Sequence, residues 1–144
     1  SVSQLEIIRQ GEAYIKEIHA CNDAIEGAEI SAKIDRMENS VRMIIARAKE
    51  RPTLTDTLRR LMNYYLPTTV KLLHAYADLD KQQKSSSNIE KSKREIEDTI
   101  DVLNDAYDRL FDDMFVDTSL DISTDVEVMR TMLEREGLTG NERK

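Results

Sequence analysis

Four aspartates recur at every fourth position near the C-terminal end of the chain: Asp113, Asp117, Asp121 and Asp125. On one continuous helix, side chains four residues apart share a face, so these carboxylates would form an acidic row. Such a row could bind a divalent metal ion, whose bound water can attack a phosphate ester, or a basic partner. If the helix breaks near Thr118, the aspartates are solvated or cap a helix start. The second alternative is favoured, because an acidic run in an acidic protein is usually a solvated face.

Three further groups have the residue types of a catalytic site without its surroundings. His74 and Asp78 form an i, i+4 pair that could hold a metal or poise a general base, although a helix contact explains them more simply. The DLD sequence ending at Asp80 has the form of an aspartate-nucleophile phosphatase motif, but it ends an expected helix where that motif follows a strand. Cys21 is the single cysteine, and Gly27 stands where a C-x5-R phosphate loop needs arginine. No catalytic set is assembled, so an enzymatic function stays open but is not favoured.

The net charge and the cysteine content limit which partners and which cellular compartment are expected. The formal net charge of −7 would repel nucleic-acid phosphates, so nucleic acid is not an expected partner. The one basic neighbourhood would receive a phosphate or an acidic partner, but pairing with the acid-rich C-terminal half of the same chain is the preferred interpretation. Its residues are Arg42, Arg47, Lys49, Arg51, Arg59 and Arg60. Cys21 excludes an internal disulfide, fits a reducing compartment and is expected to be buried.

The composition is that of a helical protein. The 144 residues include four Gly, two Pro and no Trp, and 40% are apolar, which predicts a single all-α domain over 1–144. No run approaches the roughly 18 apolar residues that a membrane span needs. Ser3 and Glu6 form an expected capping box at the start of an N-terminal helical arm over 3–50. Two apolar stripes follow, offset by one residue at Gly27, which indicates either a break or a skip in one long helix. Their residues are Ile8, Gly11, Ile15, Ile18 and Ile25, then Ile30, Ile34, Met37, Val41, Ile44 and Ala48.

The core of the domain is expected over residues 54–138. A short helix over 54–65 should be followed by a second one with Pro67 in its first turn. After a Ser-rich linker, Ser87 and Glu90 mark the start of a long helix over 89–115. Its 4-3 apolar spacing resembles a coiled coil and predicts the central helix of the bundle.

A last helix completes the expected architecture. A capping box at Thr124 and Glu127 should start it, and Gly137 should end it. Its apolar residues are expected to face inward: Val126, Met129, Met132 and Leu133. Residues 139–144 should fray. The sequence therefore predicts an elongated all-α bundle of about five helices, and its heptad stripes also permit self-association.

Several blocks of this sequence resemble the 5-bromo-4-chloroindolyl phosphate hydrolysis proteins, an XpaC-like bacterial family. The blocks are YYLPTTVKLLHAYADLD from residue 64, NIE from 88, AYDRLFDDMF from 106 and DISTDVEVMRTMLEREGL from 121. The resemblance covers the C-terminal two-thirds of the chain, from Leu54 onward. The positions that carry it are Tyr64, Tyr65, Leu66, Pro67, Leu72, Leu73, His74, Tyr76, Asp121, Asp125 and Leu138.

The resemblance implies a cytoplasmic protein that works with toxic-anion (tellurite) resistance proteins in an envelope-stress system. Many members carry membrane-spanning segments ahead of the helical region, which would tether a full-length protein to the membrane. Three hypotheses stay open. The leading one is a non-enzymatic scaffold or partner-binding domain with no cofactor. The second is a phosphate-ester hydrolase that uses a divalent metal held by the aspartate series and His74, and the third is a regulator in which a cation orders residues 113–125.

Overall fold

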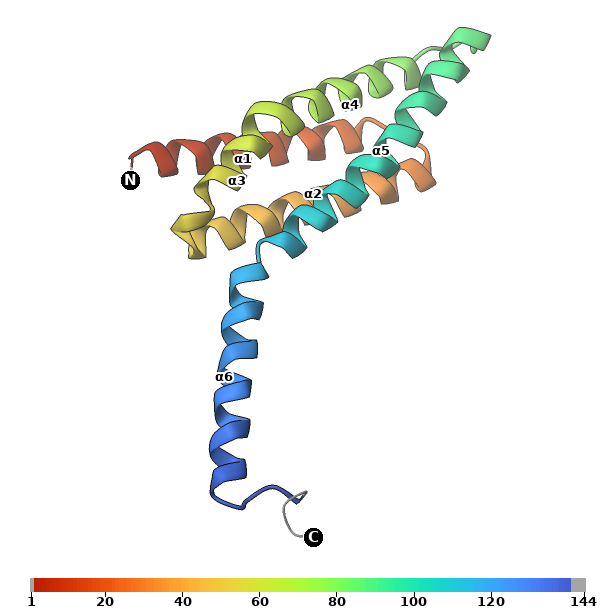
Figure 1. Ribbon diagram of the computed structural model, residues 1–144. Coiled ribbons are helices and arrows are strands. Elements are labelled where there is room, and N and C mark those ends of the chain that lie inside the picture. Colours follow the sequence, from red (N-terminus) through yellow and green to blue (C-terminus); the bar gives the residue numbers. More distant parts are fainter. Residues whose placement is uncertain (1, 141–144) are drawn as a thin grey trace. The chain divides into compact units, whose positions relative to one another are not determined.

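The computed structural model describes residues 2–140 of the chain, with side chains from Gln4 onward (Figure 1). Every regular element among these residues is helical, which confirms the all-α prediction. Whereas the sequence predicts one domain, the contacts group the chain into two compact units, residues 1–111 and 112–144. Their boundary lies close to the end of the longest helix, so each unit is described by itself.

Unit 1 contains five helices. They are α1 (Val2–Asp23), α2 (Ala28–Glu50), α3 (Thr55–Arg60), α4 (Leu66–Asp80) and α5 (Ser87–Asp113), whose last two residues belong to unit 2. A 3-10 turn (Pro52–Leu54) precedes α3, and a π-helical segment (Leu61–Tyr65) joins α3 to α4. Helix α1 lies against both α2 and α4, and α5 runs beside them (Figure 1). Unit 2 contains α6 (Val116–Arg135).

The two N-terminal stripes form much of the core of unit 1, as predicted. Ile15 and Ile18 of α1 are buried, and so is every residue of the second stripe, from Ile30 to Ala48. In the first turns of α1, Ile7 is buried and Ile8 is half-buried, so the stripe begins one residue earlier than expected. The offset at Gly27 is a true break between two helices, because α1 ends at Asp23 and α2 begins at Ala28.

Gly11 marks the closest approach of α1 to its neighbours. A Cβ atom at this position would lie 2.6 Å from Ile45 Cδ1 and 2.8 Å from Met62 Cε. Both distances are shorter than carbon atoms tolerate, so the missing side chain lets α1 pack directly onto α2 and the π-helical segment.

None of the three expected capping residues lies immediately before its helix, where a cap belongs. Ser3 follows the first residue of α1, and Thr124 is well inside α6, where its hydroxyl donates to the carbonyl of Leu120 (3.0 Å). At α5 the cap is one residue earlier than predicted, because the N–H of Ile89 donates to Ser86 Oγ (3.2 Å). The spacing of a capping box does not show which of several adjacent serines is the cap. It also does not show whether a helix has already begun before the box.

The expected boundary at Pro67 is instead a continuous helical path through a wide turn. The N–H of Leu66 donates to the carbonyl of Leu61, five residues earlier, which defines the π-turn. The widened turn makes room for the ring of Pro67. It also accommodates a residue that has no backbone N–H to donate. The Thr69 hydroxyl donates to the carbonyl of Tyr65 (2.7 Å) and accepts from Tyr107 Oη (2.7 Å), so it also fixes α5 to this turn.

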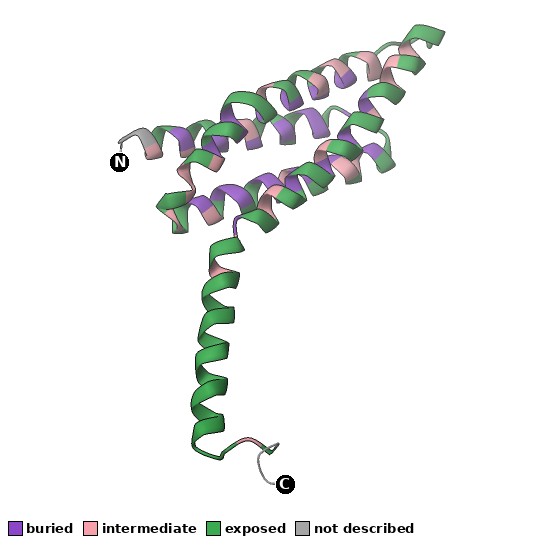
Figure 2. Ribbon diagram, viewed as in Figure 1, coloured by how far each residue is buried: buried purple, intermediate pink, exposed green. Residues whose placement is uncertain are grey.

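Helix α5 is the longest helix, as predicted, with 27 residues, and it buries a single face (Figure 2). The buried residues are Ile96, Ile100, Asn104 and Tyr107, whereas Leu103 and Leu110 are only half-buried. Burial raises the pKa of Tyr107 to about 12, so its hydroxyl remains a hydrogen-bond donor. Helix α5 therefore adds one apolar face to a core in which α1 packs mainly against α2 and α4.

Candidate functional site

The aspartate series is divided by the end of α5. Asp113 is the last residue of that helix, and α6 begins at Val116, so the break lies at Met114 and Phe115 and not near Thr118. Asp117, Asp121 and Asp125 consequently share one continuous helix and are all exposed. The predicted break near Thr118 was therefore placed too late in the chain, whereas the exposure of the aspartates agrees with the prediction that they are solvated.

The three aspartates of α6 form a row and not a cluster. Positions four apart on a helix have Cβ atoms about 6 Å apart, so short aspartate side chains along a straight row do not converge on one ion. Among the described residues, no group of three or more His, Cys, Asp or Glu side chains is placed to hold a metal ion. The row is therefore an exposed acidic surface with one sign of charge.

The apolar residues of α6 are exposed, which corrects the prediction that they face inward. The exposed fractions are 48% for Val126, 55% for Met129 and 38% for Leu133, and Ile122 is exposed as well. Figure 2 shows exposed residues along almost the whole helix. With 4-3-4 spacing and 100° per residue, these four side chains lie within about 60° of one another and form one stripe, which we call the α6 stripe.

The acidic row and the α6 stripe occupy different sides of α6. At 100° per residue, Asp117 and Asp121 lie roughly 110–150° from the middle of the stripe, and Asp125 borders it. Arg130 borders the opposite edge and pairs with Glu127 at 2.9 Å. A shallow hollow of about 240 Å³ lies at the start of the helix, lined by Asp112, Phe115, Val116, Ser119, Leu120 and Ser123. Helix α6 thus presents two chemically distinct exposed surfaces.

The histidine candidate is part of a contact between α1 and α4. His74 Nδ1 lies 3.5 Å from Cys21 Sγ, and both His74 and Asp78 are exposed. Cys21 is buried, as predicted, and burial raises the pKa of its thiol, with Glu17 and Asp78 adding to the shift. The thiol therefore stays protonated and is a poor nucleophile.

Asp80, at the end of the expected helix, forms contacts with two other elements. Its carboxylate accepts the N–H of Glu26 (3.1 Å) and pairs with Lys93 Nζ (3.1 Å). The Glu26 N–H and the Lys93 ammonium lower the pKa of Asp80, so the group is a stable anion. These contacts join the end of α4 to the α1–α2 loop and to α5, which is a structural role and not that of a free phosphatase nucleophile.

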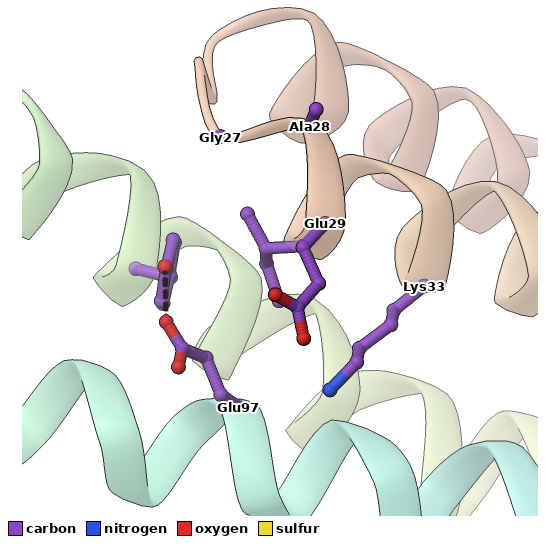
Figure 3. A pocket seen from close by; sticks show the side chains of 7 residues that line it. Gly27, Ala28, Glu29, Lys33 and Glu97 are labelled. Atoms are coloured by element: carbon purple, nitrogen blue, oxygen red, sulfur yellow. Dashed lines mark hydrogen bonds between the residues drawn. The ribbon is translucent and has the colours of Figure 1, made fainter.

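In a small pocket near the start of α2, most of the polar side chains are paired (Figure 3). Its volume is about 220 Å³, and its lining includes Glu29, Lys33, Tyr76 and Glu97. Lys33 Nζ bonds to Asp101 (3.0 Å), and Tyr76 Oη donates to Glu97 (2.6 Å). Burial and the Glu97 carboxylate raise the pKa of Tyr76. With two glutamates in its wall, this pocket disfavours a phosphate ester.

Acidic residues of α5 pair with basic residues of α2. These contacts were not predicted from the sequence. Lys33 pairs with Asp101, and Arg36 pairs with both Asp105 and Asp108. Ser40 Oγ adds a hydrogen bond to Asp108 (3.0 Å), whose pKa is lowered chiefly by Arg36. The only signal in the sequence is that positions 33, 36 and 40 border the buried stripe of α2.

The basic neighbourhood has partners other than those expected. Arg42 pairs with Glu38 at 2.9 Å, and Lys49 pairs with Glu12 at 3.3 Å. The ionic partners of these two residues come from α2 and α1 and not from the C-terminal half of the chain. Internal pairing therefore occurs in this neighbourhood, as predicted, but for Arg42 and Lys49 the acids belong to the N-terminal helices, because side-chain composition does not reveal which helix is adjacent.

The Tyr64–Pro67 positions divide between core and surface. Tyr64 and Tyr65 are exposed at the π-helical segment, whereas Leu66 and Tyr76 are buried. An exposed tyrosine pair beside a wide turn is a second candidate contact surface, since tyrosines are enriched in protein interfaces.

Comparison with known families agrees with the resemblance found in the sequence. A family model described as 5-bromo-4-chloroindolyl phosphate hydrolysis protein matches residues 5–129. The match includes the N-terminal third of the chain, which the resemblance described above does not cover. It ends before Leu138. Comparisons with curated proteins and with solved structures found no match. Within the described part of the chain, no helix is both long and apolar enough to cross a membrane.

Proposed function

Because the chain belongs to the 5-bromo-4-chloroindolyl phosphate hydrolysis protein family, we propose that it is a non-enzymatic, partner-binding helical domain of that family. The observation that carries this proposal is the exposure of both the acidic row and the α6 stripe. A helix that presents apolar and charged side chains to solvent is typical of an interaction surface.

The remaining chemical groups support a binding role. Cys21 is a buried thiol, Asp80 is held by two partners, and the pocket residues Lys33 and Tyr76 are paired with Asp101 and Glu97. A hydrolase needs a nucleophile or a metal-bound water placed beside an activating group. In this chain, such groups make packing contacts within unit 1. Binding of a partner at the surface is therefore the function that this architecture supports better than hydrolysis.

The purified chain is expected not to hydrolyse an aryl phosphate, with or without Mg²⁺, Mn²⁺ or Zn²⁺. The physical reason is that the aspartate row cannot gather three ligands around one ion. Release of the aryl alcohol is measured, with a known phosphatase as positive control and Asp121→Asn as a matched variant. Metal-dependent turnover that is lost in Asp121→Asn would establish the alternative function, a metal-dependent phosphate-ester hydrolase.

We propose that the acidic row binds a basic segment of a partner protein. Exposed carboxylates of one sign attract a basic surface and speed the encounter, and salt weakens the attraction beyond about 10 Å at 0.1 M. The family resemblance suggests a toxic-anion resistance protein as that partner and the cytoplasm as the location. Cys21, a free cysteine, is consistent with a reducing compartment.

Replacing Asp113, Asp117 and Asp121 together by Asn is expected to keep the fold and slow partner association at low salt. Removal of like charges also removes a few tenths of a kcal/mol of repulsion per neighbouring pair. Capture of partners from a lysate of the source cell is compared at low and high salt. The matched control removes three exposed charges from unit 1, with Glu6→Gln, Glu17→Gln and Asp98→Asn. Equal capture by all three proteins at both salts would reduce the row to a solvated surface.

A further inference from the structure

The α6 stripe has the spacing of a coiled-coil core. Ile122, Val126, Met129 and Leu133 follow a 4-3-4 pattern, which corresponds to heptad positions d, a, d and a. All four side chains are more than one-third exposed, so none of them is fully buried. Apolar side chains at this spacing gain most when a second helix with the same spacing covers them.

The charges of α6 indicate which kind of partner can cover the α6 stripe. The helix carries five acidic residues and two arginines, so anionic lipid headgroups would repel it. Beside the stripe, Asp125 occupies a g position and Arg130 the following e position, five residues later. In a parallel, in-register pair of helices, a g residue meets the e residue that follows it by five positions on the partner helix. Two symmetric Asp125–Arg130 pairs would therefore form between identical helices.

We propose that α6 pairs with α6 of a second copy of this chain as a parallel, in-register coiled coil. The inference rests on the proposed function, in which α6 is the binding element, and it identifies the occupant of the α6 stripe. Arg130 pairs with Glu127 of its own chain in the structure, and the same guanidinium can reach across to the second helix because it is 59% exposed.

An antiparallel pair lacks the same complementarity. In that arrangement g positions face g positions and e positions face e positions. Aligning the two stripes then places Asp125 opposite Met132 and Arg130 opposite Ser123. No opposite charges meet, so the parallel register is the one that the sequence of α6 favours.

Most of the acidic row remains available in the paired state. Asp117 and Asp121 fall at the outer positions f and c, which point away from a partner helix, whereas Asp125 lies at the edge of the helix pair. Pairing would therefore place two acidic rows on one assembly, and a partner with two basic segments would bind more tightly than to one row. The two surfaces of α6 thus have compatible and separable roles.

The expected association is weak and depends on concentration. Helix α6 has 20 residues and a length of about 30 Å, and the stripe supplies only four core layers. Sedimentation equilibrium of the full chain is expected to show a monomer–dimer equilibrium with a dissociation constant in the micromolar range. A monomer throughout, up to roughly millimolar concentration, would overturn the proposal.

Two valines provide a matched pair of variants. Val126 lies in the stripe and is 48% exposed, and Val128 lies outside it and is 53% exposed. Val126→Asp is expected to weaken the dimer by at least about a hundredfold, because two buried carboxylates would face each other. Val128→Asp should keep the wild-type dissociation constant within about threefold. Circular dichroism verifies that both remain helical, and equal weakening by both variants would contradict the stripe as the interface.

A charge exchange tests the register. Asp125→Arg alone or Arg130→Asp alone is expected to weaken the dimer about tenfold, because each places like charges opposite each other twice. The double exchange should restore the wild-type affinity. Failure of the double exchange to restore it would overturn the parallel register. Binding of a basic partner to the acidic row is scored separately with the triple Asn variant, so loss of the dimer does not by itself contradict the proposed function.

Discussion

Replacing Ile100 by aspartate is expected to unfold unit 1. Ile100 is fully buried on the inner face of α5, between Ile96 and Asn104. An unpaired carboxylate in such a position costs several kcal/mol, a large share of the 5–15 kcal/mol that stabilises a typical domain. Chemical denaturation followed by circular dichroism would show a lost or strongly shifted transition.

Val102 provides the control for this substitution. It lies two residues further along α5 and is 67% exposed, so Val102→Asp adds the same charge to the same helix in water. Its effect should stay within about 0.5 kcal/mol. Leu103→Asp should fall between the two, because Leu103 is half-buried. An unchanged denaturation midpoint for Ile100→Asp would show that this face of α5 does not pack against the other helices of unit 1.

Replacing Gly11 by leucine is expected to destabilise unit 1 by about 3 kcal/mol or more. A single Cβ would already overlap the ends of Ile45 and Met62, and leucine adds three further carbon atoms in the same place. Overpacking of this kind commonly costs about 1–3 kcal/mol, and here the side chains of both Ile45 and Met62 must move aside. The improved helix propensity of leucine over glycine recovers less than about 1 kcal/mol.

The matched control for Gly11 is Gly140→Leu, since nothing lies within 4 Å of a Cβ built at Gly140. Its unfolding free energy should equal that of the wild type within about 0.5 kcal/mol. Thermal and urea unfolding of both variants supply the measurement. Equal stability of the two variants would mean that α1 can move away from α2 without loss of packing.

The sequence predicted the helices and most of the core because apolar spacing reports which face of a helix is apolar. The stripe of α2 from Ile30 to Ala48 is buried as expected. The same reasoning failed for α6, where Val126 and Met129 are exposed although their three-residue spacing matches that of the buried Ile34 and Met37 in α2. Spacing identifies a face that can be covered, but it does not identify the element that covers it or the chain from which that element comes.

The candidate site was predicted by residue type but not by arrangement. The acidic character of Asp117, Asp121 and Asp125 was evident, whereas the start of α6 at Val116 was not, because Thr124 and Glu127 imitate a helix start. The pairing of Arg36 with Asp105 and Asp108 depends on helices that lie far apart in the sequence. Such contacts follow from tertiary packing, which local patterns do not contain.

The π-helical segment resets the helical phase of the chain. The buried residues Leu58, Met62, Leu66 and Val70 are each four positions apart. In a regular α-helix, three such steps would rotate the last side chain about 120° away from the first. One additional residue in the turn at 61–65 absorbs about 100° of that rotation, so all four side chains can face the core. Three successive four-residue steps that span a proline are therefore a pattern by which such a turn can be recognised in a sequence alone.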